Sequence, residues 1–192
     1  MSQLVRVVLM GLSLAVVAGS SLAQEQPKTP PQAGNAAAPA ANPADVASPD
    51  AILAGVYDVI SGPAGQKRDW DRMRSLFYPG ARLIHTGPDK EGAMKETSFT
   101  VDEYIQRATP YFDKSGFFER EAARHTDKWG NILQAFSTYE SRHDAKDATP
   151  FARGINSFQL FFDGKRWWIV TIYWQEESAT NPLPAEFLPH AH

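Results

Sequence analysis

The chain has 192 residues, 43% of them apolar, a formal net charge of −3 and no cysteine. This length supports one sizeable hydrophobic core, and the lack of cysteine excludes disulfides, thiolate metal sites and cysteine nucleophiles. A mildly acidic chain with interspersed charges lacks the basic surface of proteins that bind nucleic acid or anionic lipid. We therefore expect no nucleic-acid partner and no stable membrane insertion.

The N-terminus has the pattern of a secretory signal peptide. Arg6 precedes an apolar segment from Val7 to Ala18, and Ser21 and Ala23 are small residues of the kind that a signal peptidase recognises. The apolar segment is too short to span a bilayer comfortably. We expect a signal peptide over residues 1–23 and a periplasmic or secreted mature protein with 18 Lys and Arg against 22 Asp and Glu. An uncleaved membrane tether is the alternative.

Composition divides the rest of the chain into three parts. Residues 24–48 are rich in Ala and Pro and poor in large apolar side chains, which predicts a disordered linker. Residues 49–178 carry the apolar periodicity of one domain. Residues 179–192 are punctuated by proline, and we expect an extended C-terminal tail that lies along the sheet or on a neighbouring molecule.

Three helices are predicted in the first half of the domain. Ser48-Pro49-Asp50 has the residues of a helix start, and apolar residues at helical spacing follow it as far as Ile60. A second, short helix is expected over 69–77, stopped by Pro79-Gly80. Thr100 and Glu103 form a capping box that opens the third helix, which the proline at position 110 should bend or end early.

Strands are predicted in the remaining segments. Residues 81–86 form a short strand, and the polar segment 87–96 is either a loop or a loose hairpin. Residues 117–128 and 131–144 are two long strands on either side of the turn residues Trp129-Gly130-Asn131.

The two apolar runs from Pro150 to Ser178 predict a hairpin that organises the domain. Asp163-Gly164 suits a tight turn, and a turn at Gly164-Lys165 would pair the strands in a defined register. One face would be apolar near the turn and polar at its far end, whereas the other would be almost entirely apolar. We expect the first face to curl around a pocket and the second to be covered by a partner subunit or by the C-terminal tail. The expected opposed pairs are Phe162 with Trp167, Leu160 with Ile169, Phe158 with Thr171 and Asn156 with Tyr173.

The order of these elements resembles the nuclear transport factor 2-like (NTF2-like) superfamily, and more closely its SnoaL-like domains. The segments that carry the resemblance are Phe77–Leu83, Gly116–Glu121, Ser137–Arg142, Arg153–Ser157 and Trp167–Val170. The resemblance implies an α+β fold shaped like a cone, with N-terminal helices packed on a curved antiparallel sheet. The superfamily includes ketosteroid isomerases, cyclases, dehydratases and epoxide hydrolases beside many binding modules, so it implies a pocket without fixing an activity.

The resemblance also implies a set of site residues. It puts His85 at the position of the general-base aspartate of the isomerases, and the ordinary pKa of a histidine, about 6.5, suits proton transfer near neutrality. Asn156 and Tyr173 would donate hydrogen bonds to a carbonyl or a developing enolate, as an oxyanion site requires. The residues expected to line the pocket and contact the ligand are Tyr57, Trp70, Phe112, Tyr139, Phe158 and Thr171.

Two other groups of charged or titratable residues leave alternatives open. Glu140 and Arg142, together with Arg153, either clamp an anionic ligand at the rim of the pocket or form ion pairs on the outer face of the sheet. His190 and His192 either chelate a metal weakly or belong to a solvated tail. We expect neither a metal nor a cofactor.

The sequence therefore supports two functional hypotheses. The first is an exported binding domain that holds a small apolar or carbonyl-containing molecule and forms a homodimer through the outer face of its sheet. The alternative is a cofactor-independent lyase, isomerase or hydrolase that uses His85 as its general acid or base.

Overall fold

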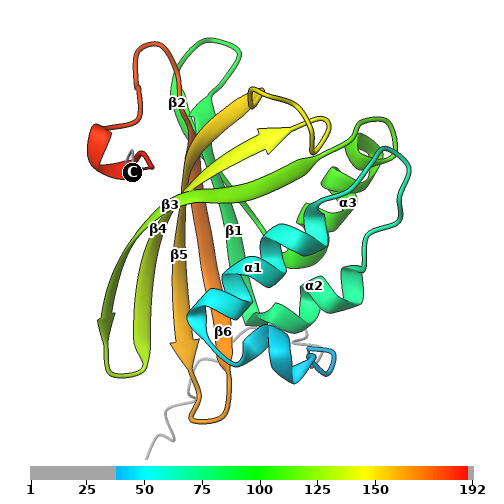
Figure 1. The fold of residues 1–192 in the computed structure, drawn as a ribbon, viewed down its shortest axis with the longest axis vertical. Helices are drawn as coiled ribbons and strands as arrows, with labels where there is room; N and C mark the ends of the chain where they lie inside the picture. The colour runs from blue at the N-terminus through cyan, green and yellow to red at the C-terminus, as the bar shows by residue number, and fades with distance from the viewer. Residues whose placement is uncertain (1–37, 190–192) are drawn as a thin grey trace, which may run out of the picture. The chain divides into compact units, whose positions relative to one another are not determined.

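The computed structural model describes residues 38–189, which fold as three α-helices on one side of a curved six-stranded sheet (Figure 1). The expected signal peptide, most of the linker and the last three residues lie outside the described range. Within that range no helix is long and apolar enough to cross a bilayer. In chain order the elements are η1 (Pro43–Val46), α1 (Pro49–Ile60), α2 (Trp70–Leu76), β1 (Phe77–Pro88), β2 (Met94–Phe99), α3 (Val101–Phe112), β3 (Phe118–Trp129), β4 (Ile132–Arg142), β5 (Ala152–Phe162), β6 (Trp167–Glu176) and η2 (Ala185–Phe187).

The strands are arranged in the order β2-β1-β6-β5-β4-β3, and all neighbours are antiparallel except β1 and β6, which are parallel. The predicted α+β class with helices on a curved sheet is confirmed. The prediction of a wholly antiparallel sheet is wrong at the β1–β6 pair. These two strands are far apart in the sequence and no hairpin joins them, so local turn signals carry no information about their relative direction.

The helix starts follow the predicted capping chemistry. Ser48 accepts a hydrogen bond from the backbone N–H of Ala51 at 3.1 Å, and both bonds of the capping box between Thr100 and Glu103 are present. Pro110 does not end α3 early, since the helix continues to Phe112. The proline lies in the last turn, so only two residues of the helix follow the point at which its missing N–H interrupts the hydrogen bonding.

Arg68 joins the end of α1 to the loop that follows. Its side chain is buried, and its guanidinium group also lies over the ring of Phe112 at 5.0 Å. Burial lowers the pKa of Arg68. The group donates to four carbonyl oxygens, that of Ile60 at the end of α1 and those of Gly62, Pro63 and Gln66 in the loop. The first of these is a carbonyl that the helix end leaves without a partner.

The first strand is longer than expected. β1 begins at Phe77, directly after α2, and Pro79-Gly80 lies inside it at an irregularity of the pairing with β6 instead of ending the helix. Gly80 has φ 85°, a conformation that glycine adopts without strain. Beyond β1, Met94–Phe99 pairs with it as β2, so the polar segment from residue 87 belongs to a hairpin.

The hairpin of β5 and β6 keeps the predicted register only near its turn. Phe162 faces Trp167 and Leu160 faces Ile169, as expected. The pairing then shifts, so that Val170 is an extra residue on β6 and Tyr173 faces Ser157. A bulge of this kind reverses the side of the sheet to which all later residues point. The predicted pairs of Phe158 with Thr171 and of Asn156 with Tyr173 are therefore wrong.

Segments from both ends of the described range pack on the domain. In η1, Val46 is buried and Asp45 pairs with Arg72 at 2.8 Å, so the packed structure begins before the predicted boundary at residue 49. At the other end, Thr138 donates a hydrogen bond to the carbonyl oxygen of Phe187, whose ring lies 5.8 Å from that of Phe136. The C-terminal tail thus covers part of the outer face of the sheet.

Candidate functional site

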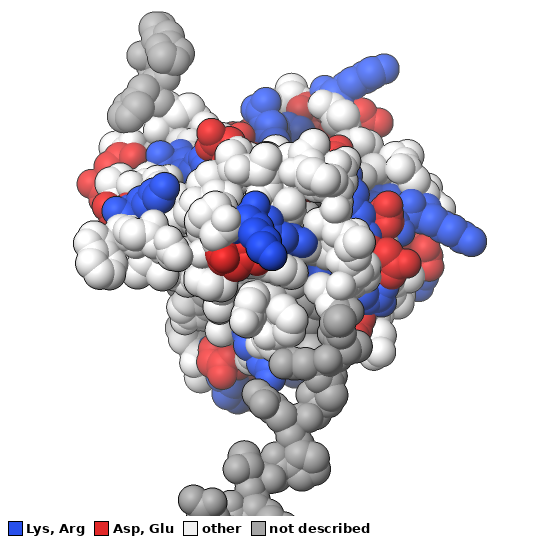
Figure 2. Space-filling view, turned by 90° about the horizontal axis from the view of Figure 1, so that it is seen from below, with Lys and Arg blue, Asp and Glu red and all other residues white. Residues whose placement is uncertain are grey.

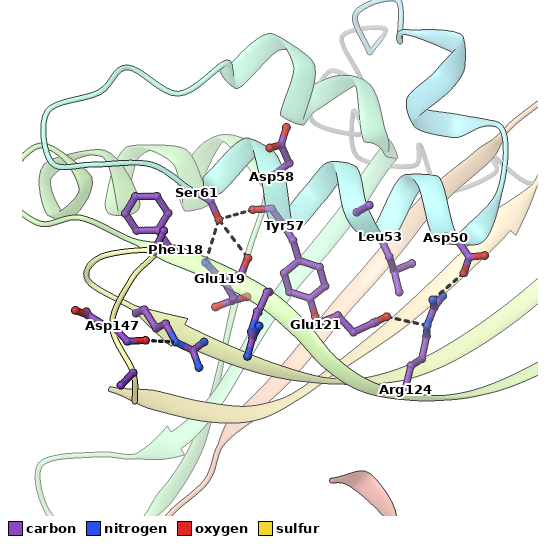
Figure 3. Close-up of a pocket in the computed structure, with 15 residues that line it drawn as sticks. Asp50, Leu53, Tyr57, Asp58, Ser61, Phe118, Glu119, Glu121, Arg124 and Asp147 are labelled. Carbon is purple, nitrogen blue, oxygen red and sulfur yellow. Dashed lines mark hydrogen bonds and ion pairs between the residues drawn. The ribbon is translucent and has the colours of Figure 1, made fainter. Parts of the chain in front are cut away.

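A pocket of about 220 Å³ lies between the sheet and helices α1 and α3. Most of its wall is apolar, and seven polar side chains interrupt it: Tyr57, Tyr104, Glu119, Tyr139, Ser141, Asn156 and Glu176. A larger groove of about 700 Å³ runs along α1, the edge strand β3 and the loop between β4 and β5 (Figure 3). Tyr57 and Glu119 border both hollows.

Glu119 is the acidic group that the fold places between the pocket and the groove. Its Oε2 accepts a hydrogen bond from the hydroxyl of Ser141 at 2.7 Å, and its Oε1 accepts one from Nδ2 of Asn156 at 3.3 Å. Burial disfavours the charged carboxylate and raises the pKa of Glu119 to about 7, although both hydrogen bonds favour the charged form. Near neutral pH the carboxyl group can therefore both accept and release a proton.

Two tyrosines present hydroxyl groups to the same pocket. Among the described residues, neither Tyr104 nor Tyr139 has a hydrogen-bond partner for its hydroxyl, and both line the pocket with Glu119. Burial, and the nearby charge of Glu119, raise the pKa of both phenols above their ordinary value. They remain protonated, and so they are hydrogen-bond donors available to a bound molecule.

The position of Tyr139 depends on a glycine. Gly154 lies opposite it on β5, and a Cβ atom there would be 2.7 Å from the tyrosine hydroxyl and 2.2 Å from the carbonyl oxygen of Gln175. Only a residue without a side chain lets the phenol lie across β5 while β6 pairs closely on the other side.

Tyr57 also lines the pocket, but its hydroxyl is already committed. The Tyr57 hydroxyl lies 2.7 Å from the hydroxyl of Ser137, and Ser137 in turn donates to Glu121 at 2.5 Å. The Tyr57 oxygen also accepts a hydrogen bond from Nδ2 of Asn156 at 3.2 Å. Its pKa is raised by burial. We conclude that Tyr57 orders the wall of the pocket and is not a free donor.

Comparison with known proteins yields similarity of fold only. No family model matches the chain, and no curated protein matches it. Among solved structures, the chain is similar to an NTF2-like protein of unknown function from Silicibacter pomeroyi, with 14% identity, 68% of this chain and 94% of the other covered, and a TM-score of 0.46. It is also similar to an NTF2-like superfamily protein from Salmonella enterica (15% identity, 70% and 85% covered, TM-score 0.42) and to a protein of unknown function with a cystatin-like fold from Nostoc punctiforme (11% identity, 67% and 87% covered, TM-score 0.49).

In its arrangement of helices and strands the chain is similar to these NTF2-like structures. The element order and the cone of helices on a curved sheet are those that the sequence resemblance implies. Identities of this size say nothing about activity, which has to be argued from the side chains in the pocket.

Of the three residues predicted to be catalytic, the pocket between the sheet and the helices contains one. Asn156 is buried and donates to Glu119. Tyr173 is 46% exposed and accepts a hydrogen bond from Thr86 outside the pocket, a consequence of the bulge at Val170. His85 does not line the pocket either, and its ring lies 5.4 Å from that of Trp174.

The residues predicted to contact a ligand divide in the same way. Tyr57, Tyr139 and Phe158 line the pocket. Trp70 and Phe112 stack on each other, with ring centroids 6.0 Å apart, and belong to the packing of α2 against α3. Thr171 pairs with Gln159 on the side of the sheet away from the pocket, so it does not contribute. The bulge brings Ile172 and Trp174 to the pocket instead.

Sequence reasoning did not identify Glu119. The charged residues around it suggested a partly exposed strand. In such a strand the sequence does not show which carboxylates face the core and which face solvent. The one signal available is alternation, since Glu119 and Glu121 share a face of β3 that meets the small polar residues Ser137 and Ser141 of β4. A carboxylate opposite a serine in a buried stripe is a candidate for a functional group.

The two alternatives for the outer charges are resolved by the ion pairs. Glu140 lies 2.8 Å from Arg142 and 2.9 Å from Arg120, and Arg153 pairs with Glu177 at 2.8 Å. All of these carboxylates are taken up by guanidinium groups from the chain itself. The arrangement is that of ion pairs in the sheet and not of an anion clamp at the pocket.

Proposed function

We propose that this protein binds a small, largely apolar molecule with a carbonyl group in the pocket between the sheet and the helices and transfers a proton to or from it through Glu119. The observation that carries the proposal is the placement of one half-buried carboxyl group in the same pocket as two phenols, Tyr104 and Tyr139, that have no partner among the described residues. In this role Glu119 replaces the histidine that the sequence suggested.

The size and lining of the pocket support the class of ligand. A cavity of about 150 Å³ is enough for benzene, so a pocket of about 220 Å³ suits a molecule of roughly one or two rings. Apolar walls favour such a molecule over a sugar or a nucleotide. The two free phenols would pair with one oxygen atom, because an unpaired polar group of the ligand would be costly to bury.

The polar groups support proton transfer as the chemistry. A carboxyl group with a pKa of about 7 is a useful base and a useful acid at neutral pH. When it removes a proton next to a carbonyl group, negative charge develops on the carbonyl oxygen, and hydrogen bonds from Tyr104 and Tyr139 would stabilise that charge. No step of this reaction needs a group that the chain does not supply.

A reporter reaction tests the base. Nitrobenzisoxazole is a small bicyclic molecule that a buried carboxylate opens by removing its ring C–H proton, with cleavage of the N–O bond to give a coloured cyanophenolate. We expect turnover that increases with pH around a midpoint of about 7 and that is lost in Glu119→Gln. The exposed Glu96→Gln is the matched control. Turnover that is unchanged in Glu119→Gln would refute the catalytic role, and binding of the probe without turnover would leave a binding module.

Export and self-association remain proposals of a different kind. The charged and apolar pattern of residues 1–23 supports an exported protein, which N-terminal sequencing of the mature form tests. A homodimer through the outer face of the sheet would cover the part of that face that the C-terminal tail does not cover. Tyr173, which is 46% exposed, lies in this uncovered part. Light scattering at micromolar concentration tests it, and a monomer would exclude that arrangement.

A further inference from the structure

A chain of hydrogen bonds runs from Asn156 through Tyr57 and Ser137 to Glu121, and its donors can point in one direction only. Glu121 pairs with Arg124 at 3.1 Å and accepts a hydrogen bond from Ser137 at 2.5 Å. A hydroxyl group has a single proton, so Ser137 must accept its other bond from Tyr57. Because Tyr57 then gives its only proton to Ser137, its oxygen can only accept the hydrogen bond from Nδ2 of Asn156.

The direction of this chain determines which end of the Asn156 amide faces Glu119. The NH₂ group of Asn156 donates one proton to Tyr57 at 3.2 Å and the other to Oε1 of Glu119 at 3.3 Å. A flipped amide would turn its carbonyl oxygen toward the Tyr57 oxygen and the Glu119 carboxylate, which is unfavourable while Tyr57 gives its proton away. The amide is therefore fixed as a donor to Glu119.

A bulge in β3 makes the far end of the chain possible. The pairing of β3 with β4 shifts between Glu121 and Ala123, so Glu121 and Arg124 face the same side although they are three residues apart. Arg124 is held in turn by Asp50 at the start of α1, at 2.7 Å. The carboxylate of Glu121 thus has a fixed cation on one oxygen and Ser137 on the other.

We propose that Glu121 is a positioning residue for Glu119. It acts through the three intervening groups of the chain, and it fixes the amide that donates to the Glu119 carboxylate. This inference rests on the proposed function, in which Glu119 moves the proton, but it can be tested without any turnover. The other titratable groups that border the pocket are Tyr57 on α1, Tyr104 on α3, Tyr139 on β4 and Glu176 on β6. The charged groups that border the groove are Asp50 and Asp58 on α1, Arg120 and Arg124 on β3, Arg142 on β4 and Asp147 in the loop that follows, and Glu121→Gln leaves all of these side chains in place.

Neutralising Glu121 has two effects on Glu119 of opposite sign. Removing a nearby negative charge favours the ionised form of Glu119 and lowers its pKa. In Glu121→Gln, however, Arg124 holds the amide oxygen, so the amide NH₂ faces Ser137 and donates to it. The chain then runs backward, Asn156 turns its oxygen toward Tyr57, and Glu119 loses a donor, which raises its pKa.

The experiment follows the carboxyl carbon resonance of Glu119 by NMR as pH changes, with Glu119→Gln identifying the signal. We expect the midpoint in Glu121→Gln to rise by about one pH unit, the size of a lost hydrogen bond to a charged group. In Asp50→Asn, which removes a charge beside Arg124 but keeps the chain, the midpoint should stay or fall. In a Ser137→Ala background the chain is cut, so adding Glu121→Gln should no longer raise it.

A midpoint that falls or stays constant in Glu121→Gln would show that only the charge of Glu121 acts, and it would overturn the inference. The same conclusion follows if the rise persists in the Ser137→Ala background. Because the readout is the titration of Glu119 itself, a wild-type protein that fails to turn over nitrobenzisoxazole would remove the proposed function and leave the positioning role intact.

Discussion

Glu119 and Ser141 lie directly opposite each other on β3 and β4, and the serine hydroxyl donates to the carboxylate at 2.7 Å. This bond favours the ionised form of Glu119, whereas burial favours the neutral form and is the larger effect, raising its pKa to about 7. The proton affinity of the site is therefore a balance between its apolar walls and two hydrogen bonds, and either one can be altered separately.

Ser141→Ala removes one of the two donors to Glu119 and is expected to raise its pKa by about one unit. The pH at which nitrobenzisoxazole turnover reaches half its maximum reports the change. Ser157→Ala, on the other side of the sheet, is the control and should leave the profile in place. A profile that is identical in wild type and Ser141→Ala would mean that the titrating base is another group.

The raised pKa of Glu119 also makes the stability of the fold depend on pH. The pKa rises from an ordinary value of 4.5 to about 7 on folding, so between these values the folded protein binds a proton that the unfolded chain has released. The free energy of unfolding should therefore fall as pH rises through this window, by about 3 kcal/mol at most.

Urea unfolding at a pH of about 5 and of about 8, on either side of the pKa, measures this loss. Glu119→Gln cannot titrate at this position, so its unfolding free energy should change less over the same range. The difference between the two proteins isolates the contribution of Glu119 from that of the other carboxyl groups. Equal pH dependence in both would contradict the raised pKa.

The sequence allowed the helices to be predicted because their determinants are local. Ser48 and Thr100 cap α1 and α3 with bonds to residues three positions away, and such spacings can be read directly from the chain. The turn at Gly164 fixed the first pairs of the β5–β6 hairpin for the same reason. Predictions of this kind require no knowledge of distant segments.

The site was harder to predict because it depends on contacts between distant segments. The bulge at Val170 exchanges Thr171 and Tyr173 for Ile172 and Trp174 in the pocket, and a uniform alternation of residues gives no sign of it. Glu119 acquires its properties from Ser141 and other residues of distant strands. The pattern of one strand cannot show that these strands will enclose its carboxylate.

Arg68→Lys tests the buried guanidinium group at the end of α1. A lysine keeps the charge but cannot reach all four carbonyl oxygens that Arg68 serves. We expect a loss of about 2–4 kcal/mol in the free energy of unfolding. Lys67→Met, at the exposed neighbouring position, should change it by less than about 0.5 kcal/mol. If Arg68→Lys lost as little unfolding free energy as Lys67→Met, the loop would tolerate unpaired carbonyl groups.

The corrected register of β6 is tested by a pair of adjacent substitutions. Trp174 lines the pocket and contacts Tyr104 with ring centroids 6.5 Å apart, so Trp174→Ala should weaken binding of nitrobenzisoxazole on the order of tenfold through lost apolar contact. Tyr173→Phe removes only a hydroxyl that bonds Thr86 outside the pocket, and binding should remain as in the wild type. Isothermal titration with both variants measures these affinities. If Tyr173→Phe weakens binding and Trp174→Ala does not, the bulge at Val170 is absent in solution and Asn156 faces Tyr173 after all.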